Sequence, residues 1–337
     1  MKPIHVALIG LGRAGQFHLQ SLRSMEGMQL VSVVDHDANL ANEVASRHHC
    51  SAHTQLESAL DDPELEAVII ASPTGAHYEQ ILMALRAGKA VLTEKPLGEN
   101  IEQIRACYQQ ARQAECSLLV GFNRRFDPTF ASLASKVRQG QIGTPMLVRI
   151  TSRDSPLPSM DYLKTSHGIF HDCLVHDLDM LRFVTGQDPI EVHAMGSNFV
   201  ADIALIGDLD NVLLSLRYES GMLASIDANR FACYGYDQRI EAFGSLGMLQ
   251  AENRSATSTA LSSADGVQRP VIEHSFPSRY REAYLQELVA FEQAIRRPDT
   301  CPITEEDVTT SHRLCDAALE SYKLGQPVSV CANQTHR

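Results

Sequence analysis

The chain has no tryptophan and few other aromatic residues, and it lacks several patterns that would place it in other classes of protein. Its 337 residues contain no apolar run long enough to span a bilayer, so we expect no membrane partner. Lysine and arginine total 29 against 41 aspartate and glutamate residues, which gives a net charge of -12. A charge of that sign repels a phosphate backbone, so nucleic acid is not expected as a partner.

The cysteines form neither a CxxC pair nor a dense framework of the kind that staples small secreted proteins. The eight of them are Cys50, Cys107, Cys116, Cys173, Cys233, Cys301, Cys315 and Cys331. This scatter predicts free, mostly buried thiols in a reducing compartment. The N-terminus also lacks a basic segment followed by an apolar signal region, because residues 5–9 run directly into a glycine-rich turn. We therefore expect a cytoplasmic protein.

Length and composition suit an enzyme with two domains. Apolar residues make up 44% of the chain and charged residues 21%, and 337 residues are too many for one ordinary core. Up to about residue 122, short β-branched runs alternate with helical patterns, which is typical of a parallel sheet covered by helices. We expect strands at residues 5–9, 30–34, 67–71, 90–93 and 117–120, and helices at 16–25, 77–87 and 101–114.

From about residue 144 the pattern changes to strands that follow one another. Strands at residues 146–152, 191–198, 212–218 and 222–229, with a turn at 219–221, predict an antiparallel sheet. Helices are expected at about 171–184, 279–296 and 305–324. Thr304 and Asp307 suit the start of the last helix, and Gly325 suits its end. Residues 256–265 are rich in serine, threonine and alanine and predict a mobile hairpin tip.

A glycine motif lies between the first predicted strand and the first predicted helix. It consists of Gly10, Gly12, Arg13, Ala14 and Gly15. In this context the glycines permit a tight turn, close approach of a pyrophosphate and close helix packing, while the helix N-terminus faces the phosphate. Asp35 follows the next strand, where a carboxylate accepts the ribose hydroxyls of NAD and repels the extra phosphate of NADP. We predict a Rossmann domain that binds NAD, with Arg13 either along the phosphates or in solvent.

Together with this motif, several segments resemble the glucose-fructose oxidoreductase, inositol dehydrogenase and rhizopine catabolism family, written Gfo/Idh/MocA. They are GLGRAGQFH at 10–18, ASPTGAHYE at 71–79, EKPLG at 94–98, GFNRRFDP at 121–128 and HDCLVHDLDMLRF at 171–183. The EKP and HDxxxHDxDMxRF elements are the specific ones. With TSRDSP at 151–156 and YGYDQR at 234–239, the chain is most similar to the inositol 2-dehydrogenase branch.

The resemblance implies an α/β fold in two parts: a Rossmann domain at 1–122, and an α+β domain with a large, open, mostly antiparallel sheet at 123–337. The last helix would pack back toward the Rossmann domain, and the open sheet face would serve a homodimer or homotetramer. The implied catalytic residues are Lys95, Asp172 and His176, with a cis Lys95-Pro96 bond. The implied cofactor contacts, besides the glycine motif and Asp35, are Ser72, Pro73, Thr74, His77 and Glu94. The implied reaction converts myo-inositol to 2-keto-myo-inositol with NAD.

Alcohol oxidation by NAD removes a hydroxyl proton as hydride leaves the same carbon, so it requires a base and a cation that stabilises the developing alkoxide. His176 and Lys95 suit these two roles. Asp172 lies four residues before His176 on one predicted helix, where its carboxylate orients the imidazole, and Asp179 extends this polar face. The alternatives are a solvated acidic helix face with an incidental histidine, and a surface lysine before a turn proline.

Further polar residues near strand ends suit contacts to a small-molecule polyol. They are Asn123 and Arg124 after the last Rossmann strand, Arg153 and Asp154 at the end of the next strand, and Tyr234 or Tyr236 on a later strand. With Lys95, Asp172, His176 and Asp179 they form the predicted substrate contacts. The pair Arg124-Arg125 equally suits ion pairs between domains. His167-Gly168 stands where the family more usually has Gly-Gly, which leaves the shape of that wall open.

Possible metal ligands are dense around the predicted catalytic helix. They are His167, His171, Asp172, His176, Asp177 and Asp179. No known ligand spacing is matched, HExxH is absent, and hydride transfer needs no metal if Lys95 holds the oxygen. We predict no metal.

Two alternative functions stay open. The first is a dehydrogenase of the same family acting on another sugar or a dihydrodiol, because a fold does not settle a substrate. The second is a regulatory protein that binds NAD and a sugar without turnover. The joint presence of Lys95, Asp172 and His176 disfavours the second, because a binding protein needs no base and cation together.

Overall fold

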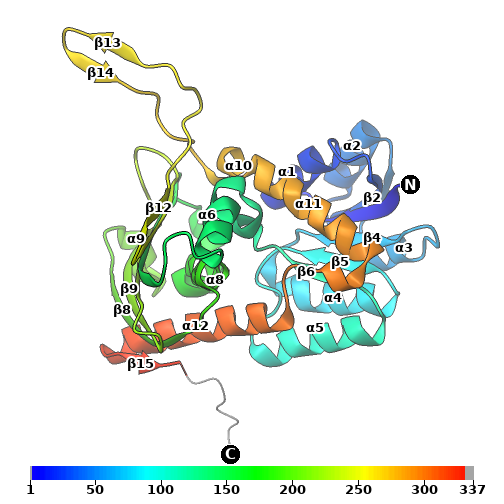
Figure 1. Cartoon of the computed structure of the whole chain (residues 1–337). Helices are drawn as coiled ribbons and strands as arrows, with labels where there is room; N and C mark the ends of the chain where they lie inside the picture. The colour runs from blue at the N-terminus through cyan, green and yellow to red at the C-terminus, as the bar shows by residue number, and fades with distance from the viewer. Residues whose placement is uncertain (1, 331–337) are drawn as a thin grey trace, which may run out of the picture. The chain divides into compact units, whose positions relative to one another are not determined.

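The computed structural model describes residues 2–330, which form two compact units (Figure 1). The first unit comprises the chain up to Phe126 together with Arg281–Thr310, and the second comprises Asp127–Tyr280 and the chain from Ser311 onward. Residues 281–310 thus belong to the first unit, although the predicted second domain contained them. The pattern of an amphipathic helix shows that it has a buried face, but it does not show which sheet covers that face.

The first unit contains a six-stranded, wholly parallel sheet, as the Rossmann prediction requires. Its order is β3-β2-β1-β4-β5-β6, with β1 Ile4–Ile9, β2 Met28–Val34, β3 Ser51–His53, β4 Ala67–Ile70, β5 Ala90–Thr93 and β6 Leu118–Val120. The four residues of β4 are completely buried, which is typical of a strand covered on both faces. The strand order reverses between β1 and β4, the place where such sheets bind ligands.

Helices and short 3-10 turns connect these strands or follow the last of them. They are α1 Arg13–Leu22, α2 Ala38–His48, α3 Leu56–Leu60, η1 Thr74–Ala76, α4 His77–Arg86, α5 Ile101–Gln113, η2 Asn123–Phe126, α11 Arg281–Arg296 and η4 Pro298–Thr300. The sequence analysis predicted neither α2 nor α3, nor the short strand β3. Helix α2 begins where the Asp37 side chain accepts hydrogen bonds from the amides of Asn39 and Leu40, which is a usual N-terminal cap.

The second unit contains a seven-stranded sheet of order β12-β11-β7-β10-β9-β8-β15. The strands are β7 Pro145–Arg153, β8 Pro189–Ser197, β9 Asn211–Tyr218, β10 Leu223–Asn229, β11 Asp237–Gly244, β12 Gly247–Ala251 and β15 Val328–Ser329. The sheet is mostly antiparallel, as predicted, but β7 and β10 pair in parallel. A row of strands in the sequence does not reveal this pairing, because β7 and β10 are not consecutive strands.

A separate hairpin, β13 Leu261–Ser263 and β14 Gly266–Gln268, extends from the rest of the second unit (Figure 1). It overlaps the predicted hairpin tip at residues 256–265. The helices of this unit are α6 Pro128–Arg138, α7 Met160–Leu163, a π-helical turn Phe170–Leu174, α8 Val175–Thr185, α9 Ala201–Leu205 and α10 Phe276–Arg279.

Helix α12, Glu305–Leu324, begins in the first unit and continues into the second. Its bounds agree with the prediction because both ends carry local signals. The Thr304 hydroxyl accepts from the Asp307 amide, and the Asp307 carboxylate accepts from the Thr304 amide, which forms a reciprocal cap. Gly325, with φ of +65°, follows the last turn.

Among residues 2–330, no helix is both long and apolar enough to cross a membrane.

The seven cysteines within the described residues are free, as predicted. The expectation that they are mostly buried was wrong, because Cys107 and Cys315 are buried, Cys233 is exposed and the other four are half-buried. Burial, with a smaller effect of Glu79, raises the pKa of Cys107 to about 12, so this thiol stays protonated at neutral pH. Cys331 lies outside the described residues.

Candidate active site

The glycine turn between β1 and α1 contains two glycines that the backbone requires and one that it does not. Gly10 has φ of +85°, and a Cβ there would lie 2.6 Å from the Ala71 carbonyl oxygen. A Cβ on Gly15 would lie 2.1 Å from the Gly10 carbonyl oxygen. A Cβ on Gly12, by contrast, would meet no atom within 4 Å. Packing therefore does not require glycine at position 12, and the open space there leaves room for a dinucleotide phosphate at the start of α1.

Asp35 lies directly after β2 and holds the glycine turn. Its Oδ2 accepts a hydrogen bond from the Leu11 amide at 2.8 Å, and its Oδ1 accepts one from the Asp37 amide at 3.0 Å. Oδ1 also lies 3.1 Å from Nδ1 of the exposed His36, whereas Oδ2 can accept a further hydrogen bond, so a ribose hydroxyl of NAD fits this position. Arg13 begins α1 and is exposed, and Ala14 is half-buried.

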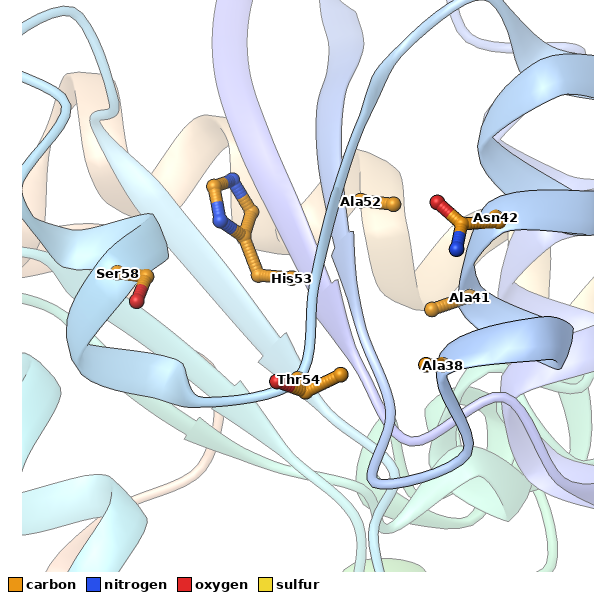
Figure 2. A pocket seen from close by; sticks show the side chains of 7 residues that line it. All are labelled: Ala38, Ala41, Asn42, Ala52, His53, Thr54 and Ser58. Atoms are coloured by element: carbon orange, nitrogen blue, oxygen red, sulfur yellow. The ribbon is translucent and has the colours of Figure 1, made fainter.

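A shallow hollow of about 250 Å³ lies among α2, β3 and α3 (Figure 2). Its lining is small and polar, and consists of Ala38, Ala41, Asn42, Ala52, His53, Thr54 and Ser58. None of the predicted site residues lines it. A backbone hydrogen bond connects its lining to the predicted cofactor residue Asp35, whose amide donates to the His53 carbonyl at 3.1 Å.

The EKP turn after β5 is joined to the segment after β4 by a buried histidine. His77 Nδ1 lies 2.8 Å from the Pro96 carbonyl oxygen, and His77 Nε2 lies 2.9 Å from the Ser72 carbonyl oxygen. The Lys95-Pro96 bond is cis, as the resemblance implied, and Lys95 is half-buried. These residues therefore lie at the carboxyl ends of two neighbouring parallel strands, where ligands bind in such sheets. Thr74 opens the turn η1, directly after Pro73.

Glu94, the first residue of the EKP motif, is held by a histidine of α1. Its Oε1 lies 2.9 Å from Nε2 of the buried His18, whose ring meets the Tyr284 ring edge-on. On α11, burial and then the charge of Glu94 raise the pKa of Glu287 well above its ordinary value, which favours its neutral form. These contacts explain why α11 belongs to the first unit.

In the second unit, Asp172 is buried, and its carboxylate accepts hydrogen bonds from several side chains, including Tyr162, Arg230 and the more distant Cys173 thiol. The Tyr162 hydroxyl donates to Oδ1 at 2.6 Å, and Arg230 donates from NH1 to Oδ2 at 3.0 Å. Arg230 is completely buried and also donates to Asp208 at 2.8 Å. Asp208 in turn accepts from the Ile169 amide at 2.9 Å. The Arg230 guanidinium thus links the Asp172 carboxylate, through Asp208, to the backbone at Ile169.

The charge state of this cluster follows from its ion pairs. Burial disfavours the Arg230 charge, but Cys173, Asp172 and Asp208 outweigh that effect and raise the pKa of Arg230. Asp177 and Asp179 are also buried, at 0% and 1% exposure, and Ser311 Oγ lies 3.5 Å from Asp179. The alternative of a solvated acidic helix face is therefore wrong, because these carboxylates do not face water.

The helix that carries Asp172 and His176 is not the single α-helix that was predicted. Asp172 lies in the π-helical turn, whose hydrogen bonds run from i to i+5, and half-buried His176 lies in the first turn of α8. His167, which stands where the family more usually has glycine, adopts φ of +64° in the turn that leads into this helix. The left-handed conformation explains why a glycine suits that position.

The predicted substrate contacts of the second unit fall into separate groups. Asp154 lies with Asp172, since the Cys173 thiol donates to Asp154 at 3.5 Å. Arg153 instead binds Asp227 at 2.6 Å and the Tyr234 hydroxyl at 3.0 Å. Successive side chains of a strand point to opposite faces of the sheet. Because Ser152 of β7 is buried, the neighbouring Arg153 side chain lies on the open face.

The expectation that Tyr234 or Tyr236 lies on a strand was wrong. Both precede β11, because Gly235 adopts φ of +127° and the Tyr236 amide donates to the Glu273 carbonyl rather than to a strand. Tyr236 is buried, and its ring packs edge-on against that of Tyr280 at 5.8 Å. Tyr234 is exposed, and its hydroxyl donates to Asp237 at 2.6 Å.

Asn123 and Arg124 lie in the turn η2 of the first unit, and both are buried. The neighbouring Arg125 forms an ion pair with Asp307 at 3.1 Å, within the same unit. Opposing the effect of burial, Arg125 lowers the pKa of Asp307 to about 2.

Comparison with known proteins agrees with this geometry. A family model described as "Oxidoreductase family, NAD-binding Rossmann fold" matches residues 4–122, and one described as "GFO/IDH/MocA C-terminal domain" matches residues 130–250. The chain belongs to the Gfo/Idh/MocA family. It is 37% identical to an inositol 2-dehydrogenase of Rhizobium meliloti, over 97% of this chain and 99% of that protein.

Two crystal structures of similar proteins cover nearly the whole chain. One is a myo-inositol dehydrogenase from Corynebacterium glutamicum, with a TM-score of 0.92, 35% identity and coverage of 98% of this chain and 100% of that one. The other is a scyllo-inositol dehydrogenase from Lactobacillus casei with bound NAD(H) and scyllo-inositol. Its TM-score is 0.91 at 29% identity, and 98% of this chain and 99% of that chain are covered.

Within this Gfo/Idh/MocA member, sequence reasoning missed the partners of Asp172. Arg230 directly follows β10, and a charged residue at a strand end is a signal that could have drawn attention to it. Tyr162 lies on the four-residue helix α7, and Asp208, the second partner of Arg230, lies in a loop. No periodic pattern in the sequence distinguishes either residue.

Proposed function

We propose that the chain is an NAD-dependent dehydrogenase that oxidises a secondary hydroxyl of a cyclic polyol, and that myo-inositol is its substrate. The observation that carries this proposal is the buried Asp172 carboxylate, held by Arg230 and Tyr162 one helical turn before His176. A solvated surface helix would not bury a carboxylate and pair it with a buried guanidinium. Membership of the Gfo/Idh/MocA family and its inositol dehydrogenase relatives support the choice of reaction and substrate.

In the proposed mechanism, His176 is the base that takes the proton of the reacting hydroxyl. Lys95 provides a positive charge that stabilises the developing alkoxide. NAD, when bound, accepts the hydride that leaves the same carbon. His176 becomes an imidazolium as it takes the proton, and the carboxylate of Asp172 offsets this new charge.

Asp172 acts best if its position and charge are fixed before the substrate arrives. Donors of different strength hold it, among them the neutral Tyr162 hydroxyl and the charged Arg230 guanidinium. Because hydrogen bonds from a charged donor are stronger, Arg230 contributes more to the orientation of the carboxylate. Tyr162 and Arg230 are therefore proposed as positioning residues.

The proposed preference for NAD over NADP rests on Asp35. Its carboxylate is buried and fixed by the Leu11 and Asp37 amides, so it cannot swing away from an additional phosphate. The remaining proposed cofactor contacts are those named from the sequence, namely Gly10, Gly12, Arg13, Ala14, Gly15, Ser72, Pro73, Thr74, His77 and Glu94. The first compact unit would bind the cofactor and supply Lys95, Asn123 and Arg124, and the second would supply the other proposed substrate contacts.

We also propose that the chain self-associates through the open face of the second-unit sheet. The strand register sets Met248, Phe243, Leu147 and Leu223 side by side across β12, β11, β7 and β10. Phe243, Met248 and Leu223 are each between 43% and 51% exposed. A continuous apolar row of this kind is costly in water, and a second copy of the chain would cover it. A cytoplasmic location is proposed as well, since free thiols suit a reducing compartment.

The experiment that tests the function is a panel of inositols, aldoses and diols, each assayed with NAD and with NADP by the absorbance of the reduced nicotinamide. Turnover of myo-inositol with NAD is expected. Turnover confined to an aldose or a diol would support the alternative function, a dehydrogenase of the same family that acts on another sugar or a dihydrodiol. Binding of NAD without turnover of any compound would support a regulatory protein.

A further inference from the structure

Two histidines and an aspartate from distant parts of the sequence meet on the surface of the second unit. His171 lies in the π-helical turn, whereas His312 and Asp316 lie one turn apart on α12. His171 and Asp316 are separated by 145 positions in the sequence. The ligand spacings considered from the sequence did not include this set, because His312 and Asp316 lie far from His171 in the chain.

The donor atoms of these three side chains converge. His171 Nε2 lies 2.9 Å from Asp316 Oδ1, and His312 Nε2 lies 3.7 Å from Asp316 Oδ2. One donor atom from each residue lies within 4.8 Å of the others, and the two imidazole rings are 5.0 Å apart. From these contacts we propose that His171, His312 and Asp316 form a binding site for a divalent transition-metal ion.

The chemistry of the three ligands limits the choice of metal. Two imidazoles and one carboxylate suit Zn²⁺, Ni²⁺ or Cu²⁺, whereas Ca²⁺ and Mg²⁺ prefer oxygen ligands throughout. Bonds of about 2.0–2.1 Å around a tetrahedral ion place neighbouring ligand atoms about 3.4 Å apart. The two spacings to Asp316 lie on either side of that value, and the three donor atoms lie within 4.8 Å of one another, so side-chain rotation would complete the site. Three protein ligands leave a fourth position for water.

The surroundings suit a site that is partly preformed. The His171 and His312 side chains are only 16% and 9% exposed, which fixes two ligands, while Asp316 is 54% exposed and is able to adjust. Bound metal would connect the π-helical turn to α12. It would thereby add a cross-link next to Asp172, which shares that turn. The competing explanation is a metal-independent contact in which His171 simply hydrogen-bonds to Asp316.

The test uses the whole chain after removal of metals with EDTA and dialysis, with Ni²⁺ as the probe. Isothermal titration calorimetry would measure stoichiometry and affinity, and differential scanning calorimetry would measure the shift in Tm. The variants are His312→Gln and Asp316→Asn, which leave the predicted catalytic residues unchanged. The control is His48→Gln, which removes a half-buried histidine of α2. Circular dichroism would verify that each variant is folded.

The wild-type chain and His48→Gln are expected to bind one Ni²⁺ per chain at this site, and the bound ion is expected to raise their Tm. His312→Gln and Asp316→Asn are each expected to bind Ni²⁺ at least tenfold more weakly, and Ni²⁺ is expected not to raise their Tm. Equal binding by all four proteins, or no binding by the wild type, would overturn the proposal. If either variant fails to fold, the other decides the question, because each removes one of the three ligands.

Discussion

Arg230 and Asp172 form a buried ion pair in which the guanidinium also binds Asp208. The arginine lies at the end of β10 and the aspartate in the π-helical turn, so the pair fixes the start of the candidate catalytic helix to the central sheet of its unit. A pair of this kind adds little net stability relative to apolar side chains, but breaking it leaves buried charges without compensation.

The first prediction concerns Arg230. Arg230→Met should destabilise the protein by about 3–5 kcal/mol, because the buried Asp172 and the half-buried Asp208 both lose their cation. Urea unfolding would measure this change. Tyr162→Phe removes only a hydroxyl from the same carboxylate and should cost about 1 kcal/mol. If both variants fold, kcat should fall more than KM rises. An Arg230→Met variant as stable as the wild type would contradict the structural role of the pair.

The second prediction separates cofactor binding from folding at the glycine turn. Gly12→Ala should weaken NAD binding with less than about 1 kcal/mol loss of stability, because its Cβ enters open space at the start of α1. Gly15→Ala should reduce the free energy of unfolding by more than 2 kcal/mol, because its Cβ collides with the Gly10 carbonyl. Calorimetric titration with NAD and urea unfolding would measure the two effects. Unchanged NAD affinity in Gly12→Ala would count against the assigned role.

The third prediction tests the choice of cofactor. Asp35→Asn removes the charge that would repel NADP but keeps a side-chain acceptor for one of the two amides it binds. The ratio of kcat/KM for NAD to that for NADP should fall by at least tenfold. Asp37→Asn is the matched control, since it removes a charge two residues away and asparagine caps α2 equally well. A wild-type enzyme that uses NADP as well as NAD would contradict the claim.

The fourth prediction concerns pH and the ion pair of Arg125 with Asp307. The folded pKa of Asp307 is about 2, below its ordinary value of 3.8, so the folded state binds this proton less tightly than the unfolded chain does. The resulting stability, about 2 kcal/mol, is present above pH 4 and is lost as the pH falls toward 2.

Arg125→Met should therefore lower the free energy of unfolding most at neutral pH, and its difference from the wild type should shrink between pH 4 and pH 2. Urea unfolding at several pH values would measure this. Arg112→Met is the control, because the pair of Arg112 with Glu305 is largely exposed and should contribute less than about 1 kcal/mol. A constant difference at all pH values would show that the loss is due to packing.

Features with local signals were predictable from the sequence. The buried parallel strands appear as short apolar runs, and α12 has both a capping pair and a terminal glycine. The features that were missed depend on contacts between distant segments. The Arg230 contact to Asp172 is of this kind, as is the meeting of His171 with α12.

Tyr236 illustrates the opposite error. An aromatic-rich segment is typical of a strand, but Gly235 has a positive φ that does not fit a strand, and β11 begins only at Asp237. The roles of Lys95 and His176 stay predictions, since they depend on a bound substrate. What the structure adds is the burial of Asp172, Asp177 and Asp179, which excludes a solvated helix face.

The most direct test of the proposed function is the rate of NAD reduction with saturating myo-inositol at neutral pH, compared between the wild type and His176→Ala. The wild type should reduce NAD, and the variant should lose roughly two to four orders of magnitude in kcat while it still binds NAD. His274→Ala, which removes an exposed histidine of the same unit, should keep its activity. If the wild type oxidises myo-inositol and His176→Ala retains most of that rate, His176 is not the base and the proposed mechanism is wrong.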